Sequence, residues 1–272
     1  MQSEAIPVTG KEVGDMIMGH LQDTPSLFGH KVHLPETFFS FDILGIHVNI
    51  GLTQHVVMML LAAFLLLLMA IMLRKRIGMV PRGLANLVEA FVIFIRDEIA
   101  KPNMGEHAAL RFTPYLCTTF FFILFCNLIG LVPYGASATG NLAVTASLAF
   151  VAFLMIQYAG MRTMGVLGYF KHLVPAGVPW WLAPLMVVVE LMGVVAKPFA
   201  LAVRLFANML AGHAVILSLI GLIFLMGWKI TPVSVGFGVF IYCLELFVAF
   251  LQAYIFTMLT AVFIGLLAAE AH

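Results

Sequence analysis

The stretch LAVRLFANMLAGH, residues 201–213, places an arginine in the middle of a long apolar tract that runs from about residue 181 to residue 228. Arginine keeps its charge at any biological pH, so Arg204 cannot enter a lipid environment by losing a proton. Holding the charge there costs from about 3 to more than about 10 kcal/mol, depending on the water and the partners it finds. Arg204 therefore needs an anion or a water path beside it.

The composition of the whole chain is that of a membrane protein. Of its 272 residues, 62% are hydrophobic and only 10% are charged, and the mean hydropathy is +1.07. A soluble domain is about half apolar and about a quarter charged. Several apolar runs exceed the roughly 20 residues that a helix needs to cross a bilayer. The sequence therefore predicts an all-α polytopic membrane protein.

The chain divides into a polar N-terminal segment, residues 1–50, and a membrane domain, residues 51–272. The polar segment holds six of the thirteen acidic residues and two of the fourteen basic ones. Residues 13–21 could form a short amphipathic helix. The segment lacks a basic start followed by a long apolar core, so we expect no signal peptide.

Five membrane crossings are expected. Between the first two, apolar residues recur at spacings of three and four with charges between them, which predicts an amphipathic helix lying in the membrane interface at about 82–101. The last two tracts are too long for an upright crossing, because 48 residues of helix measure about 70 Å against about 30 Å of hydrocarbon. We expect them to tilt steeply, kink, or run partly along the membrane plane, as a hairpin that can follow a large curved partner. The predicted crossings are 52–73, 113–132, 142–159, 181–228 and 232–268.

The basic residues predict the orientation of the chain. Nine of the fourteen lie in the loops after the first and third crossings, and the positive-inside rule places such loops in the cytoplasm. The N-terminus is then outside, and five crossings put the C-terminus inside. The nine residues are Arg74, Lys75, Arg76, Arg82, Arg96, Lys101, Arg111, Arg162 and Lys171.

Polar residues recur every seven positions in the last two tracts. Glu190, Lys197 and Arg204 share one helix face with a drift of about 20° per step, and Asn208 extends this stripe by one turn. His213 follows Arg204 by nine residues, which is about 900° of rotation and places it on the opposite side of the helix.

The last tract repeats the spacing with Glu245 and Gln252, and Tyr242 lies three residues before Glu245. Acidic residues deep in apolar tracts usually serve transport, so the pattern suggests an ion path with one fixed positive charge.

Other interpretations of these polar residues stay open. Glu190 and Lys197 could form a structural ion pair, His213 could donate to a carbonyl in a helix contact, and Gln252 could bridge two helices. A secondary transporter for an anionic substrate would predict internal symmetry between the two halves, which the sequence lacks. A scaffold whose charges only hold partner helices is the third alternative.

Nothing in the sequence indicates catalysis, a metal or a cofactor. It contains no P-loop, no GxGxxG and no CxxC pair. The three cysteines, Cys117, Cys126 and Cys243, lie in apolar tracts and are interpreted as small core residues rather than disulfide partners or metal ligands.

Several motifs lie in order along the chain: PRGLANLVEAFVIFIRDEI, FCNLIGLVP, ELMGVVAKPFALAVRLFANM, RLFANMLAGH and ELFVAFLQAYIFTMLT. They resemble subunit a of the F-type ATP synthases, the stator subunit beside the rotating ring of c subunits. The similarity covers about residues 80–265 in the order and spacing of the family, and residues 1–50 match poorly.

The resemblance implies roles for individual residues. Arg204 corresponds to the essential arginine that faces the carboxylates of the c-ring, and Asn208 and Gln252 match polar partners near it. Glu190, His213 and Glu245 match positions that line two aqueous half-channels.

Two positions depart from a common bacterial pattern. That pattern has an acid where His213 stands and a histidine where Glu245 stands, so the pair is exchanged here, as in mitochondrial members. Asn141 stands where many members carry an aspartate, and no channel role is transferred to it. Lys197 and Tyr242 are further candidates for channel lining.

The implied function is non-catalytic ion translocation. An ion enters one half-channel, loads a c-ring carboxylate, rides the rotating ring and leaves through the second half-channel, while Arg204 keeps the channels apart. The implied partners are the c-ring, b-type peripheral stalk subunits, the soluble catalytic head and the lipid bilayer, with no nucleic acid and no cofactor. The expected location is a bacterial plasma membrane, with the mitochondrial inner membrane as the alternative, and the coupling ion is a proton or sodium.

Overall fold

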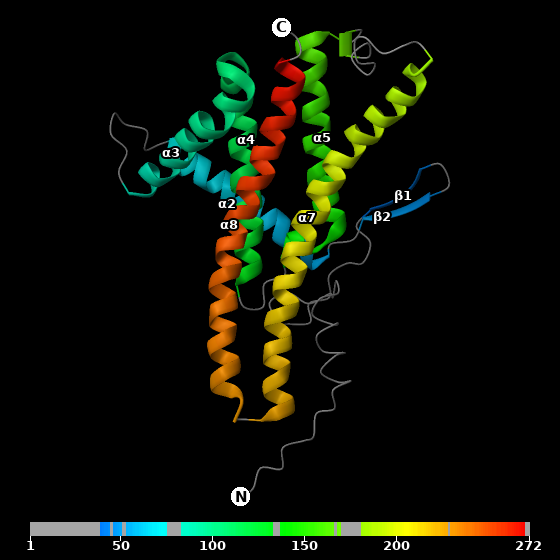
Figure 1. The fold of residues 1–272 in the computed structure, drawn as a ribbon. Helices are drawn as coiled ribbons and strands as arrows, with labels where there is room; N and C mark the ends of the chain where they lie inside the picture. The colour runs from blue at the N-terminus through cyan, green and yellow to red at the C-terminus, as the bar shows by residue number, and fades with distance from the viewer. Residues whose placement is uncertain are drawn as a thin grey trace, which may run out of the picture. The chain divides into compact units, whose positions relative to one another are not determined.

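The structure is a computed structural model that describes residues 39–43, 46–50, 53–74, 83–132, 137–165, 168–169, 181–227 and 229–269. Most of these residues are helical (Figure 1). The short amphipathic helix expected at residues 13–21 lies outside the described residues.

Five helices among the described residues are long and apolar enough to cross a membrane, which confirms the predicted multi-pass helical fold. Many of their apolar side chains face outward, such as Phe64 and Leu67 on the first of them, as a lipid-facing surface requires. The spans involve α2 (Gln54–Arg74), α4 (Lys101–Leu131), α5 (Leu142–Met164), α7 (Ala183–Met226) and α8 (Thr231–Ala269).

The segment before α4 is helical but interrupted. Helix α3 (Leu84–Phe94) continues into a π-helical turn, Ile95–Ala100, and then into α4. At Gly105 the backbone leaves the helical region, with φ 73° and ψ 167°, a conformation that a residue without a Cβ adopts most readily. Helix α4 starts earlier than the crossing predicted at residue 113, because polar residues such as Glu106 and Arg111 continue the helix beyond its apolar part.

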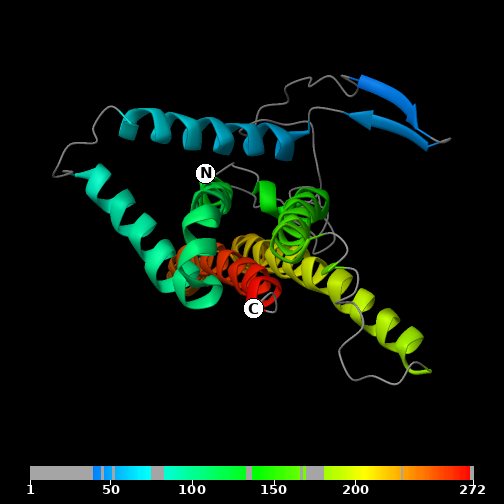
Figure 2. The same ribbon diagram turned by 90° about the horizontal axis from the view of Figure 1, so that it is seen from above.

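A short β-hairpin precedes α2 and was not predicted. Strands β1 (Phe39–Ile43) and β2 (Ile46–Ile50) pair in antiparallel fashion, with Phe39 opposite Ile50 and Ile43 opposite Ile46 (Figure 2). Apolar residues alternate in both strands, which is the period-two pattern of a strand.

The chain forms two compact units, each built from segments of the same long helices. The first comprises Met1–Ala62, Cys126–Val144 and Leu205–Phe250, and the second Ala63–Phe125, Thr145–Arg204 and Leu251–His272.

In the second unit the end of α8 packs closely against α4. A Cβ added at Gly265 would lie 1.9 Å from the backbone oxygen of Asn103, so only glycine permits this approach. Figures 1 and 2 show the red end of α8 beside α4. An aromatic cluster on α3 and α4 adds to this core, with ring centroids of Phe91 and Phe120 5.8 Å apart and those of Phe120 and Phe121 5.3 Å apart.

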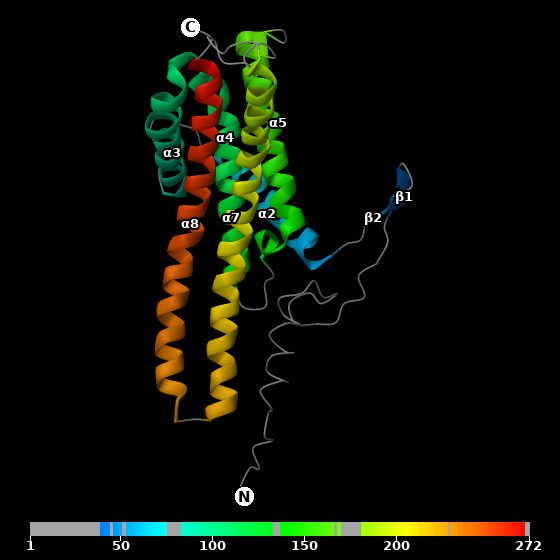
Figure 3. The same ribbon diagram turned by 45° about the vertical axis from the view of Figure 1, so that its right-hand side comes forward.

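In the first unit the second half of α7 and the first half of α8 run side by side as an antiparallel hairpin (Figures 1 and 3). The Ser234 hydroxyl on α8 donates to the Leu219 carbonyl on α7 at 3.2 Å. The last turns of α4 belong to the same unit, and the polar residues discussed next lie where α4 meets this hairpin.

Candidate functional site

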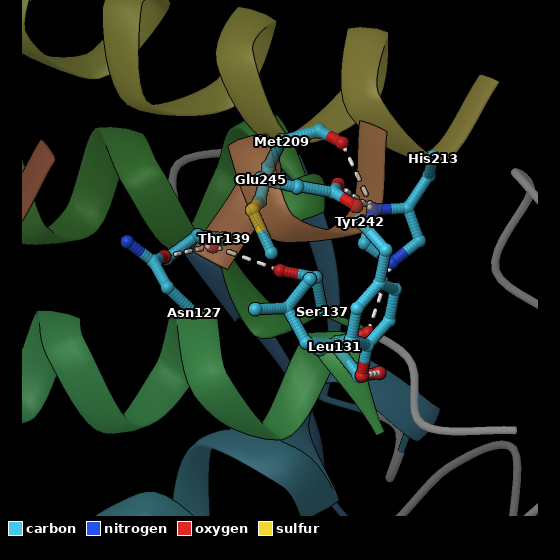
Figure 4. A network of polar contacts seen from close by, with 9 residues as sticks. Asn127, Leu131, Ser137, Thr139, Met209, His213, Tyr242 and Glu245 are labelled. Atoms are coloured by element: carbon cyan, nitrogen blue, oxygen red, sulfur yellow. Dashed lines mark hydrogen bonds and ion pairs between the residues drawn. The ribbon is translucent and has the colours of Figure 1, made fainter. Parts of the chain in front are cut away.

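The acidic residue predicted in the last tract is buried. The side chain of Glu245 on α8 is 4% exposed, and neither carboxylate oxygen has a hydrogen-bond partner among the described residues. The imidazole of His213 on α7 lies beside it, with Nδ1 3.2 Å from Glu245 Oε1, and carries a compensating charge when it is protonated (Figure 4). A carboxylate taken out of water needs a counter-charge or a proton, so the two side chains form one unit.

Both nitrogens of the His213 imidazole also face backbone carbonyls. Nδ1 lies 3.0 Å from the Met209 oxygen on the same helix, and Nε2 lies 3.0 Å from the Gly130 oxygen at the end of α4. A carbonyl oxygen only accepts hydrogen bonds, so both contacts are satisfied together only when the imidazole carries two protons. The helix contact considered for His213 is therefore present in addition to its pairing with Glu245.

A glycine makes room for this pair. A Cβ added at Gly212 would lie 2.2 Å from Glu245 Oε1 and 2.7 Å from its carboxyl carbon. The GH sequence at residues 212–213 therefore places a histidine that can contact Glu245 next to a residue small enough to admit the carboxylate.

Tyr242 lies one turn before Glu245 on α8, and its hydroxyl donates to the Leu131 carbonyl at 2.6 Å. The side chain is 41% exposed. The residue proposed from the sequence as channel lining is thus tied to the end of α4.

A buried polar cluster that sequence analysis missed lies beside this site. The Asn127 amide nitrogen donates to the Ala249 carbonyl at 3.1 Å, and its oxygen accepts from the Thr139 hydroxyl at 2.7 Å. The hydroxyls of Thr139 and Ser137 are 2.9 Å apart, and His55 Nδ1 donates to the Ser137 carbonyl at 2.8 Å. A polar residue inside the apolar α4 tract was the available signal, because such residues need partners.

Arg204 has a different environment from Glu245. Its side chain is exposed, and within the described part of the chain it makes no ion pair and no hydrogen bond. Asn208, one turn on, is also exposed, whereas Leu201 and Leu205 of the same helix are buried. The predicted stripe therefore presents its cation on an outward face of α7.

The remaining predicted residues have separate surroundings. The Lys197 ammonium lies 5.3 Å from the centroid of the Phe263 ring on α8, a cation–π contact. Gln252 is buried, at 3% exposure. The side chain of Glu190 lies outside the described residues, so its pairing with Lys197 stays a prediction.

The chain is similar to a set of bacterial proteins. The profile of the family described as ATP synthase A chain matches residues 56–265. ATP synthase subunit a 2 of Chlorobaculum tepidum is 48% identical over 270 residues, which cover 95% of this chain and 74% of that protein. ATP synthase subunit a of Myxococcus xanthus is 53% identical over 230 residues, covering 82% and 75% of the two chains. ATP synthase subunit a of Anaeromyxobacter dehalogenans is 57% identical over 218 residues, covering 78% of this chain and 57% of that protein.

Proposed function

The chain belongs to the ATP synthase A chain family, and on this premise we propose that it is the ion-translocating stator subunit of an F-type ATP synthase. Two aqueous half-channels pass protons to and from the carboxylates of a c-ring, and Arg204 separates them. The observation that carries this proposal is the contrast between a buried His213–Glu245 pair and an exposed arginine with no ion pair among the described residues.

The His213–Glu245 pair acts as a proton relay in one half-channel. Histidine is the side chain whose ordinary titration lies nearest physiological pH, and Glu245 Oε1 is close enough to exchange a proton with it. When Nδ1 gives its proton to Glu245 Oε1, the contact with the Met209 carbonyl loses its hydrogen bond, whereas Nε2 keeps the proton that it donates to the Gly130 carbonyl. Glu190 and Lys197 are assigned to half-channel lining as well.

Arg204 attracts a deprotonated c-ring carboxylate and repels a passing cation. At a separation of about 4 Å and an effective dielectric constant near 20, the attraction is roughly 4 kcal/mol. One charge that crosses about 100 mV gains about 2.3 kcal/mol, so the two energies are comparable. The positive charge of Arg204 can therefore favour release of the proton from the c-ring carboxyl group into the half-channel without trapping the rotor. Asn208 shares the exposed face of Arg204, and Gln252 provides a buried amide on α8.

The remaining assignments concern the membrane and the partners. The bacterial relatives favour a bacterial plasma membrane. The distribution of basic residues favours an N-terminus outside and a C-terminus in the cytoplasm. Residues 1–50 form the outer polar segment and residues 51–272 the membrane domain, with residues 82–101 in the interface. The long α7–α8 hairpin lies tilted along the c-ring, and the b-type stalk and the soluble head complete the complex.

The direct test of the proposal is proton conduction by vesicles that contain the chain with or without a c-ring. We expect a potential-driven proton flux only from the assembled a–c complex, because neither half-channel crosses the membrane alone. Equal conduction by the chain without a c-ring would mean a continuous pore and would exclude the proposal. Uptake of a small anion by the chain alone would favour the transporter alternative.

Replacing Gly212 with alanine is expected to slow ATP-driven proton pumping about tenfold. The added Cβ would overlap the Glu245 carboxylate and displace it from His213, and misplacement by about 1 Å can cost on the order of a hundredfold in rate. Pumping is measured in membrane vesicles and divided by the amount of assembled complex. Gly193→Ala on the same helix is the matched control, because a Cβ there meets nothing within 4 Å. Equal rates for both variants would show that this close contact is unimportant.

A further inference from the structure

The end of helix α4 carries backbone acceptors that the helix itself does not use. The last carbonyls of a helix have no intrahelical partner and need donors from elsewhere. Two such donors come from the α7–α8 hairpin, because His213 approaches the Gly130 oxygen and the Tyr242 hydroxyl donates to the Leu131 oxygen. The last turn of α4 thus contacts both helices that carry the proton-relay pair.

The contacts between α4 and α8 bracket Glu245. Tyr242 precedes Glu245 by three residues, and Ala249, whose carbonyl accepts from Asn127, follows it by four. Their partners on α4, Leu131 and Asn127, are also four residues apart. One hydrogen bond therefore lies on each side of Glu245 along α8. Together the two bonds oppose both sliding of α8 along α4 and rotation of α8 about its own axis.

The Asn127 amide is itself held in one orientation. Thr139 donates to its oxygen, so its nitrogen is the atom directed at the Ala249 carbonyl. Thr139 is fully buried and shares a hydrogen bond with Ser137 (Figure 4). His55 in turn donates to the Ser137 carbonyl. The buried polar cluster therefore determines which atom of Asn127 contacts α8.

We propose that Tyr242 and Asn127 are positioning residues that fix the Glu245 carboxylate against the His213 imidazole. This inference rests on the proposed relay role of that pair, and it assigns Tyr242 a role other than channel lining. The need for it is physical, because the Glu245 carboxylate has no hydrogen bond of its own among the described residues. Its place depends on the backbone that carries it, and that backbone is held at Tyr242 and Ala249.

The test is ATP-driven proton pumping by complexes that carry Tyr242→Phe, which removes only the hydroxyl. We expect the rate per assembled complex to fall about two- to tenfold, the range that corresponds to one hydrogen bond. We also expect the dependence of the rate on pH to change, because a displaced carboxylate exchanges protons with His213 less readily. Tyr158→Phe on α5 is the control, since that tyrosine is half exposed and makes no hydrogen bond among the described residues.

A second variant, Asn127→Leu, removes the other contact. If the two contacts hold the same helix, each partly compensates for loss of the other. The pumping rate of the double variant should then fall by a larger factor than the product of the factors for the two single variants. A Tyr242→Phe complex with the native rate and pH profile would overturn the inference. The inference would also be overturned if Tyr242→Phe only reduced the amount of assembled complex and left the rate and pH profile per complex unchanged. That result is the signature of a merely structural residue.

A Glu245→Gln complex separates failure of the inference from failure of the proposed function. If Glu245→Gln stops pumping while Tyr242→Phe leaves the rate and pH profile unchanged, the relay stands and the positioning role is wrong. If Glu245→Gln pumps at the native rate, the relay itself is wrong, and the positioning role falls with it.

Discussion

Replacing Arg204 with lysine is expected to abolish ATP synthesis, with a rate at least about a hundredfold below that of the native complex. A charge-assisted hydrogen bond is worth about 1.5–3 kcal/mol, so losing both bonds of a bidentate contact costs about 3–6 kcal/mol, and every 1.4 kcal/mol corresponds to about a tenfold change. Lysine keeps a positive charge, but its compact, strongly hydrated ammonium lacks the planar fork of five donors. The measurement is ATP synthesis by energised vesicles, per assembled complex.

The control for Arg204→Lys removes a cation elsewhere. Lys229 is exposed in the connection between α7 and α8, and Lys229→Met should leave synthesis close to the native rate. Native synthesis by the Arg204→Lys complex would mean that charge alone suffices and would contradict the role given to the guanidinium.

Replacing Glu245 with glutamine should reduce ATP-driven proton pumping by at least about a hundredfold. Glutamine keeps the shape of the side chain but cannot gain or lose a proton, and a positioned acid–base group contributes about 10²–10⁴-fold to a proton-transfer step. The side chain is buried beside His213, and within the described part of the chain no other carboxylate forms an ion pair with that imidazole. Acidification of vesicles after addition of ATP measures the rate.

Glu89→Gln serves as the control for this variant. Glu89 is an exposed acid on α3, so its loss should leave pumping unchanged. Native pumping by the Glu245→Gln complex would show that protons bypass the His213–Glu245 pair.

The helices of this chain could be predicted from its sequence because lipid imposes a simple rule. Every backbone polar group inside a bilayer must be paired within the segment, so long apolar tracts become helices. Helix α5 (Leu142–Met164) covers the whole tract expected at 142–159 and continues beyond it, and α8 (Thr231–Ala269) covers the tract expected at 232–268. The β-hairpin at Phe39–Ile43 and Ile46–Ile50 was missed because its strands are short and lie in a polar segment, where a period of two is easily overlooked.

The site was predicted only in part. The spacing of Arg204 and His213 predicts that they lie on opposite sides of one helix, and both residues do belong to α7. The contacts of His213 with Gly130 and of Tyr242 with Leu131 were beyond sequence reasoning, since backbone carbonyls at a helix end carry no residue signature. Asn127 did carry a signal, as an amide in an apolar tract, but its partner is a carbonyl 122 positions away.

The distance from the Arg204 guanidinium to the nearest c-ring carboxylate, measured in a density map of the intact membrane complex, tests the central claim most directly. The account predicts a separation of about 4 Å or one bridging water in at least one rotary position, with His213 and Glu245 on the side of α7 away from the c-ring. A guanidinium that points at lipid headgroups, or that stays paired with an acid of its own chain in every rotary position, would contradict it.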